Sequence, residues 1–235
     1  MTHPPRYVDA KPIDFWLARG AILVIVGLQL GLVNDLTVGP RWLAPAIELA
    51  LLIPLSIATA WTQKTARKAS TESQWHLLAK EKRLVRRLAI SLTFVITLMN
   101  FGALAQLIEA MVTGHAGTGR TLLLDALNIW ATNVVIFALW FWTIDRSDPM
   151  RRGLLAEEHA DFLFPQYQQD RDSRTARWIP GFIDYLFLAY TNATAFSPAD
   201  TFPLTARAKL LMMVESAISF VTIALVASRA VGILA

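Results

Sequence analysis

Long apolar stretches constrain this chain more than any other feature of its sequence. Four windows, at about residues 15 to 33, 42 to 62, 86 to 112 and 122 to 144, are dominated by apolar side chains, and a fifth lies at about 207 to 233. A helix needs roughly 20 residues to cross a hydrocarbon core about 30 Å thick. Backbone polar groups in lipid must be hydrogen-bonded within their own segment. The windows therefore predict an all-α fold, a polytopic transmembrane helical bundle of five to six membrane segments.

The composition agrees with a membrane protein. Of the 235 residues 54% are hydrophobic and only 17% charged, and the mean hydropathy is +0.43. Soluble domains carry roughly 25% charged residues. Cysteine is absent, which excludes disulfides, thiolate metal sites and cysteine nucleophiles. The net charge of +4 is typical of basic cytoplasmic loops, so we expect a lipid bilayer as partner and no nucleic acid.

The distribution of basic residues predicts the orientation and the division of the chain. Residues 63–87 hold eight basic and two acidic side chains, and the positive-inside rule places such a loop in the cytoplasm. We therefore expect a multi-pass protein of the inner (plasma) membrane with a cytoplasmic N-terminus. Residues 1–144 form the predicted four-helix transmembrane region, 145–179 a cytoplasmic polar linker, and 180–235 a C-terminal helical hairpin.

Enzymatic motifs are missing from the sequence. His159 stands beside three acidic residues in the predicted linker, but no second histidine follows at metal-ligand spacing. There is no phosphate-binding loop, nucleophile elbow or zinc-protease motif. We expect no catalytic residues, no metal, no cofactor and no enzymatic activity.

The C-terminal hairpin carries the grouping most typical of a functional site. A short apolar segment runs into TNATAFSPAD, and a long helix follows Pro203, Thr205 and Arg207. This order resembles the pore module of the tetrameric cation-channel superfamily. It resembles more closely a family of uncharacterised bacterial integral membrane proteins whose C-terminal hairpin is a degenerate version of that module.

The resemblance implies roles for four residues. Thr191 and Thr194 would end a pore helix, Ser197 would lie in the filter region, and Asp200 would take the place of the acidic residue that ends the filter. The sequence departs from the channel pattern because no glycine occurs between residues 181 and 232. Glycines give a potassium filter access to the backbone conformation that it needs, so potassium selectivity of the usual kind is not expected.

The short segment at 181–197 allows two topologies. It either crosses the membrane completely, giving six spans, or forms a re-entrant loop on the cytoplasmic side. Arg207 and Lys209 favour the re-entrant loop, and Arg229 favours the crossing. Of the two, we favour the complete crossing.

The last helix has a polar stripe. Glu215, Ser219 and Thr222 are spaced to share one face with Val226 and Arg229. Glu215 could bind a cation or carry a proton, or it could be the structural partner of a basic group such as Arg19 or Arg207. Glu48 is a second candidate, because it lies between two prolines inside the second predicted helix.

Two functions follow from these patterns. The first is channel-like or transporter-like permeation of a small cation or proton, with a homo-oligomer as one arrangement. The second is a non-transporting membrane subunit or scaffold that binds a partner through residues 145–179. The candidates for a permeation path are Glu215, Asp200, Thr191, Thr194, Ser197, Ser219, Thr222 and Glu48.

Overall fold

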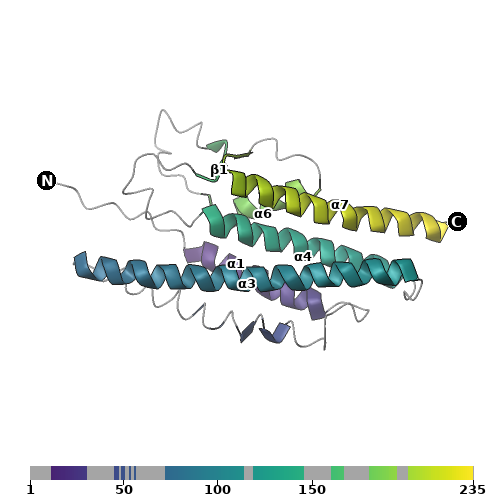
Figure 1. Ribbon diagram of the computed structural model, residues 1–235, viewed down its shortest axis with the longest axis horizontal. Helices are drawn as coiled ribbons and strands as arrows, with labels where there is room; N and C mark the ends of the chain where they lie inside the picture. Colours follow the sequence, from purple (N-terminus) through teal and green to yellow (C-terminus); the bar gives the residue numbers. More distant parts are fainter. Residues whose placement is uncertain are drawn as a thin grey trace.

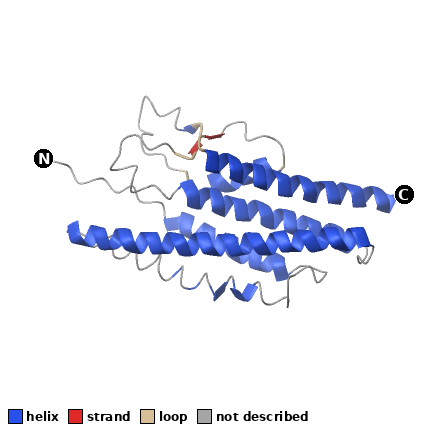
Figure 2. Cartoon of the chain, viewed as in Figure 1, coloured by secondary structure: helices blue, strands red, loops and turns tan. Residues whose placement is uncertain are grey.

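A computed structural model of the chain describes residues 12–30, 45–47, 49–50, 53, 56, 72–113, 119–145, 160–166, 180–194 and 201–234. These residues are mostly helical (Figure 2). The helices are α1 (Pro12–Leu30), α3 (Glu72–Thr113), α4 (Gly119–Asp145), α6 (Phe182–Ala193) and α7 (Ala206–Leu234). Two short strands, β1 (Phe162–Leu163) and β2 (Phe202–Pro203), pair in an antiparallel ribbon. The helices lie alongside one another in a single elongated bundle (Figure 1).

Three helices are long and apolar enough to cross a membrane. These stretches are Leu84–Thr113, Gly119–Asp145 and Ala206–Ser228, and they confirm three of the predicted apolar helices. The first window forms a shorter apolar helix, Trp16–Leu30. In the second window residues 45–47, 49, 50, 53 and 56 are helical, and its other residues lie outside the described part. The total number of spans stays a prediction.

Helix α4 forms the centre of the bundle. It contacts α1, α3, α6 and α7. Ile136, Phe137, Ala138 and Phe141 are fully buried, and buried residues run through α4 from Leu122 to Asp145. A helix that is apolar on all sides is stable only where neighbours or lipid surround it. The apolar sequence of α4 thus explains its central place.

Helix α4 defines the two ends of the bundle. We call the end at Gly119, where α4 begins, the far end, and the end at Asp145, where α4 finishes, the near end. Helix α3 is antiparallel to α4, since the Trp140 indole donates a hydrogen bond to Thr97 (2.9 Å) while residues 103–107 pack against 122–129. Helix α1 begins at the near end and reaches the far half, where the Asn128 amide donates to the Leu28 carbonyl (2.5 Å).

Helices α6 and α7 both begin at the near end. The Phe182 N–H donates to Asp14 in the first turn of α1 (3.2 Å), and the Tyr185 hydroxyl donates to Asp145. The Asp161 N–H also donates to Asp145 (3.0 Å), and the Asp161 carboxylate binds Arg207 in the first turn of α7. The starts of both helices are therefore tied to the same end of α4.

Helix α6 is short for the complete crossing that the sequence led us to favour, and the choice between a crossing and a re-entrant loop stays a prediction. Its 12 residues span about 18 Å, well short of a hydrocarbon core of about 30 Å. By Thr201 the chain has returned to the near end, because β2 pairs with β1 there. Apolarity shows that the segment is buried but not how deep it runs, which explains why the sequence does not separate the two topologies.

An aromatic cluster packs the ribbon against the near end. Phe162 of β1 is buried between Phe141 (ring centroids 5.2 Å apart) and Tyr185 (6.3 Å), and Phe164 contacts Tyr185 from another side (5.4 Å). Residues 160–166 of the predicted polar linker thus belong to the packed bundle. Residues 146–159 and 167–179 lie outside the described part, so the linker and the domain division stay predictions.

Candidate functional site

Most of the candidate site lies on the buried face of α7. Among the α7 side chains up to residue 228, the buried ones are Ala208, Met212, Glu215, Ser219 and Thr222, at spacings of four, three, four and three. Such spacing forms a narrow seam along one side of a helix. The helix starts at Ala206 because Thr205 caps it: the Ala208 N–H donates to the Thr205 hydroxyl (3.4 Å). The last three residues of this seam are polar; Glu215 contacts α6 and Ser219 contacts α4.

Glu215 is the central residue of this seam. Its side chain is completely buried, with 0% exposure. Its Oε2 accepts a short hydrogen bond from the Asn192 amide (2.6 Å), whereas its Oε1 is buried and has no hydrogen-bond partner. Glu215 lies about 14 Å along the axis from the start of α7, roughly half the thickness of a hydrocarbon core.

Asn192 reaches Glu215 from the last turn of α6. Its Nδ2 also donates to the Met212 carbonyl (3.0 Å), and its Oδ1 accepts from the Ser216 hydroxyl (3.2 Å). A carbonyl oxygen can only accept, so the bond to Met212 fixes which side of the amide carries the nitrogen. Asn192 therefore presents N–H groups, and not its oxygen, to Glu215.

Asn133 of α4 closes the cluster from the opposite side. Its Nδ2 donates to the Ser219 hydroxyl (2.9 Å) and to the Glu215 backbone carbonyl (3.4 Å). The bond to a carbonyl again fixes the orientation of the amide. Three helices thus contribute to one network, which we call the Glu215 cluster: Asn133, Asn192, Glu215, Ser216 and Ser219.

No basic residue in the described part of the chain pairs with Glu215. Arg19 donates to the Ser56 carbonyl (3.2 Å) and lies over the Trp16 ring, with its guanidinium carbon 5.2 Å from the ring centroid. Arg207 grips the Asp161 carboxylate with two hydrogen bonds (2.6 and 2.5 Å). Both arginines proposed from sequence as structural partners for Glu215 are thus engaged elsewhere.

The other permeation candidates fall into three groups. Ser219 and Thr222 share the buried seam with Glu215, although the Thr222 hydroxyl donates to the backbone of its own helix (2.8 Å). The hydroxyls of Thr191 and Thr194 likewise donate to carbonyls of α6, so the structure does not bring them to Glu215. Glu48, Ser197 and Asp200 lie outside the described residues.

Asn192 and Asn133 are the residues of the cluster that sequence reasoning missed as site residues. In the sequence, Asn133 is one of several amides of the kind that hold helices together. Asn192 stands in a short segment between two threonines, which the pore-module resemblance makes more prominent. A polar residue isolated in an otherwise apolar helix is a weak signal, since it does not identify the partner. For Asn192 the partner is Glu215, which is 23 residues away in the sequence.

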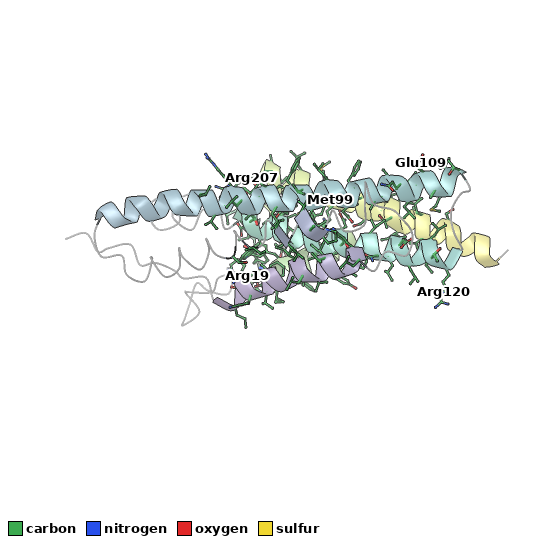
Figure 3. All side chains as sticks on the ribbon, turned by 90° about the horizontal axis from the view of Figure 1, so that it is seen from below. Arg19, Met99, Glu109, Arg120 and Arg207 are labelled. Atoms are coloured by element: carbon green, nitrogen blue, oxygen red, sulfur yellow. The ribbon has the colours of Figure 1, made fainter. Side chains whose placement is uncertain are left out.

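A second polar cluster closes the near end. Asp161 is only 3% exposed and binds Arg207, which is 50% exposed, and it accepts a further bond from the Thr205 hydroxyl (2.5 Å). Figure 3 shows Arg19 and Arg207 toward this end and Glu109 and Arg120 toward the far end. Every oxygen of the Asp161 carboxylate is thus used in fixing the start of α7.

The Glu215 cluster differs chemically from this second cluster. An ionised carboxylate that is buried without a counter-charge costs several kcal/mol, so such a group takes up a proton or a cation. Within the described residues, no three His, Cys, Asp or Glu side chains come together in a way that could hold a metal ion. Glu215 has one oxygen that no other group uses. That oxygen is where the site can bind something.

The fold and this cluster define a helical protein with three helices that could cross a membrane and with a buried carboxyl group between α4, α6 and α7. Comparison with protein-family models, with curated proteins and with solved structures gave no match. The resemblance to the bacterial membrane-protein family therefore stays a prediction from the sequence.

Proposed function

We propose that this chain is an integral membrane protein that moves a proton or another small cation, with Glu215 as the group that binds it. The observation that carries the proposal is the Glu215 side chain itself: completely buried, unpaired with any described basic residue, and with one oxygen lacking a hydrogen-bond partner. Carboxyl groups at such depth in a membrane are costly and commonly mark ion or proton pathways.

We further propose that α6 is a re-entrant half-helix that enters from the cytoplasm and returns to it. Helices α6 and α7 begin at the same end of the bundle, and the basic residues are distributed unevenly between the two ends. Arg86 and Arg87 of α3 lie toward the near end with Arg207 and Lys209 of α7, whereas Arg120 begins α4 at the far end. The positive-inside rule then makes the near end cytoplasmic. Helix α7 would cross outward and leave the C-terminus outside.

Flux into proteoliposomes tests the permeation function. The purified protein is reconstituted beside Glu215→Gln, which keeps the size of the side chain and an oxygen that can accept from Asn192. We expect cation or proton flux in the wild type and its loss in the variant. Glu109→Gln is the matched control, because Glu109 is an exposed acid of another apolar helix and should leave the flux unchanged.

The alternative function predicts a different result. A non-transporting subunit or scaffold would show no flux under any gradient, in the wild type as in both variants. That outcome would overturn the permeation proposal, and the Glu215 cluster would then be a structural joint between α4, α6 and α7.

A further inference from the structure

The atoms that surround Glu215 distinguish between the two cargoes that the proposed function allows. We infer that Glu215 binds a proton and not a metal cation; this inference rests on the proposed function and narrows it. Two features decide between these cargoes: the atoms of the Glu215 cluster that face the carboxyl group, and the oxygen lone pairs that are already used in hydrogen bonds.

Metal cations need several oxygen ligands at once. Magnesium takes six, and calcium takes six to eight. The two amides beside Glu215 instead present hydrogens: Asn192 donates to Oε2 at 2.6 Å, and Asn133 donates to the backbone carbonyl of Glu215 at 3.4 Å. An N–H group directed at the site repels a cation. A metal ion at the carboxyl group would have to turn Asn192 over to gain an oxygen ligand from it, and Asn133 directs its N–H groups to Ser219 and to a backbone carbonyl.

Turning the amides over would break other hydrogen bonds. A rotated Asn192 would set its oxygen against the Met212 carbonyl, which now accepts from its Nδ2 at 3.0 Å. A rotated Asn133 would do the same at the Glu215 carbonyl. Each rotation would lose the hydrogen bond that the amide now donates, worth about 0.5–1.5 kcal/mol, and would set two oxygen atoms against each other in a buried place. The network therefore holds Asn192 in the orientation that disfavours a metal ion at the carboxyl group.

A proton needs only one oxygen, and Oε1 supplies it. In the protonated state Oε1 carries the hydrogen while Oε2 keeps the bond from Asn192. On release the O–H bond breaks, its electron pair stays on the carboxylate, and the proton passes to water. The bond from Asn192 then becomes charge-assisted, so that both states of the acid are accommodated. The described groups that face Glu215 from α4, α6 and its own helix are uncharged: Asn133, Asn192, Ser216 and Ser219.

Flux measurements in which one cation replaces another test this inference separately from the proposed function. Proteoliposomes are given a pH gradient in choline buffer without sodium or potassium, and separately a sodium or potassium gradient at equal pH. We expect proton flux in choline for wild type and Glu109→Gln, its loss in Glu215→Gln, and its return in Glu215→Asp, which restores an acid. We expect no Glu215-dependent flux of sodium or potassium.

Two other results would each overturn a different statement. Sodium or potassium flux that depends on Glu215, without proton flux in choline, would overturn the proton inference and leave the permeation function standing. Absence of all flux would overturn the permeation function itself.

A pH-difference infrared spectrum of the reconstituted protein provides a readout that is independent of transport. We expect a carboxylic-acid C=O band that Glu215→Gln removes and that exchange of choline for sodium leaves in place; a band displaced by sodium would overturn the inference.

Discussion

Asn192 contributes to the site through hydrogen bonds rather than through packing. It donates to the Oε2 atom of Glu215, while Oε1, the atom that we propose binds the proton, has no hydrogen-bond partner. A hydrogen bond to a charged group contributes about 1.5–3 kcal/mol, and about 1.4 kcal/mol corresponds to a tenfold change in rate. Replacement by leucine removes the donor at nearly constant volume. We therefore expect Asn192→Leu to lower the proton flux by about tenfold or more.

A second asparagine gives the matched control for this prediction. Asn128 also donates from α4 to a backbone carbonyl, but its acceptor is Leu28 of α1. Asn128→Leu should reduce stability without changing the flux per folded molecule. Flux is measured in proteoliposomes at equal density of folded protein. Equal losses in the two variants would mean that Asn192 acts through general stability and not through Glu215.

The sequence predicts part of this residue-scale picture. The spacing of Glu215, Ser219 and Thr222 places them on one face of a helix, and the structure shows all three buried on that face. The same spacing does not show which side chains lie opposite. Asn133 and Asn192 are 82 and 23 residues from Glu215, and only the packing of three helices brings them there.

At the scale of elements, α6 is fixed to α1 by a close approach at its first residues. Gly181 precedes the helix, and a Cβ atom placed there would lie 2.8 Å from the Oδ1 atom of Asp14. That carboxylate accepts from the Phe182 N–H, one of the unpaired donors at the start of the helix. Because Gly181 has no side chain, the Asp14 carboxylate of α1 has room to cap the start of α6.

This approach predicts opposite effects for two glycine substitutions. Gly181→Ala should displace Asp14 and destabilise the protein by about 1–3 kcal/mol, the usual cost of overpacking. Gly27 lies inside α1, and a Cβ atom there meets nothing within 4 Å. Gly27→Ala should leave stability unchanged or raise it by up to about 1 kcal/mol, because alanine favours a helix. Thermal unfolding of both purified variants in detergent checks the prediction. Equal melting temperatures would contradict the tight contact.

Apolar length predicts the helices well and their depth poorly. The windows at 86 to 112, 122 to 144 and 207 to 233 correspond to α3, α4 and α7, since twenty apolar residues have few other stable forms in lipid. The start of α6 depends instead on Asp14, which is 168 residues away. A contact of that separation leaves no trace in local periodicity.

The arrangement of the whole molecule predicts a pattern of chemical accessibility. Leu204 lies near the start of α7 and is exposed, and Val112 lies at the far end of α3 and is 81% exposed. Since the native chain has no cysteine, single cysteines at these positions report their sides without background. We expect an impermeant maleimide added to intact cells to label Val112→Cys and not Leu204→Cys.

Permeabilised cells provide the control for this experiment. Both cysteines should react once the reagent reaches each side of the membrane. Rapid labelling of Leu204→Cys in intact cells would place the start of α7 outside and contradict the cytoplasmic re-entrant half-helix. The sequence alone leaves the two topologies open, because the basic residues of the last 55 positions occur toward both ends of α7.

The polar seam of α7 also determines how this helix can slide. Apolar contacts between helices in lipid discriminate weakly between neighbouring positions, because lipid tails are as apolar as leucine. A slide of one turn, about 5.4 Å, would replace Glu215 opposite Asn192 by Leu211 or Ser219 and leave the amide without its carboxyl partner. The hydrogen bonds around Glu215 therefore set the register of the last helix, and a mutation that removes one of them is expected to loosen the packing of α7 against α4 and α6 as well.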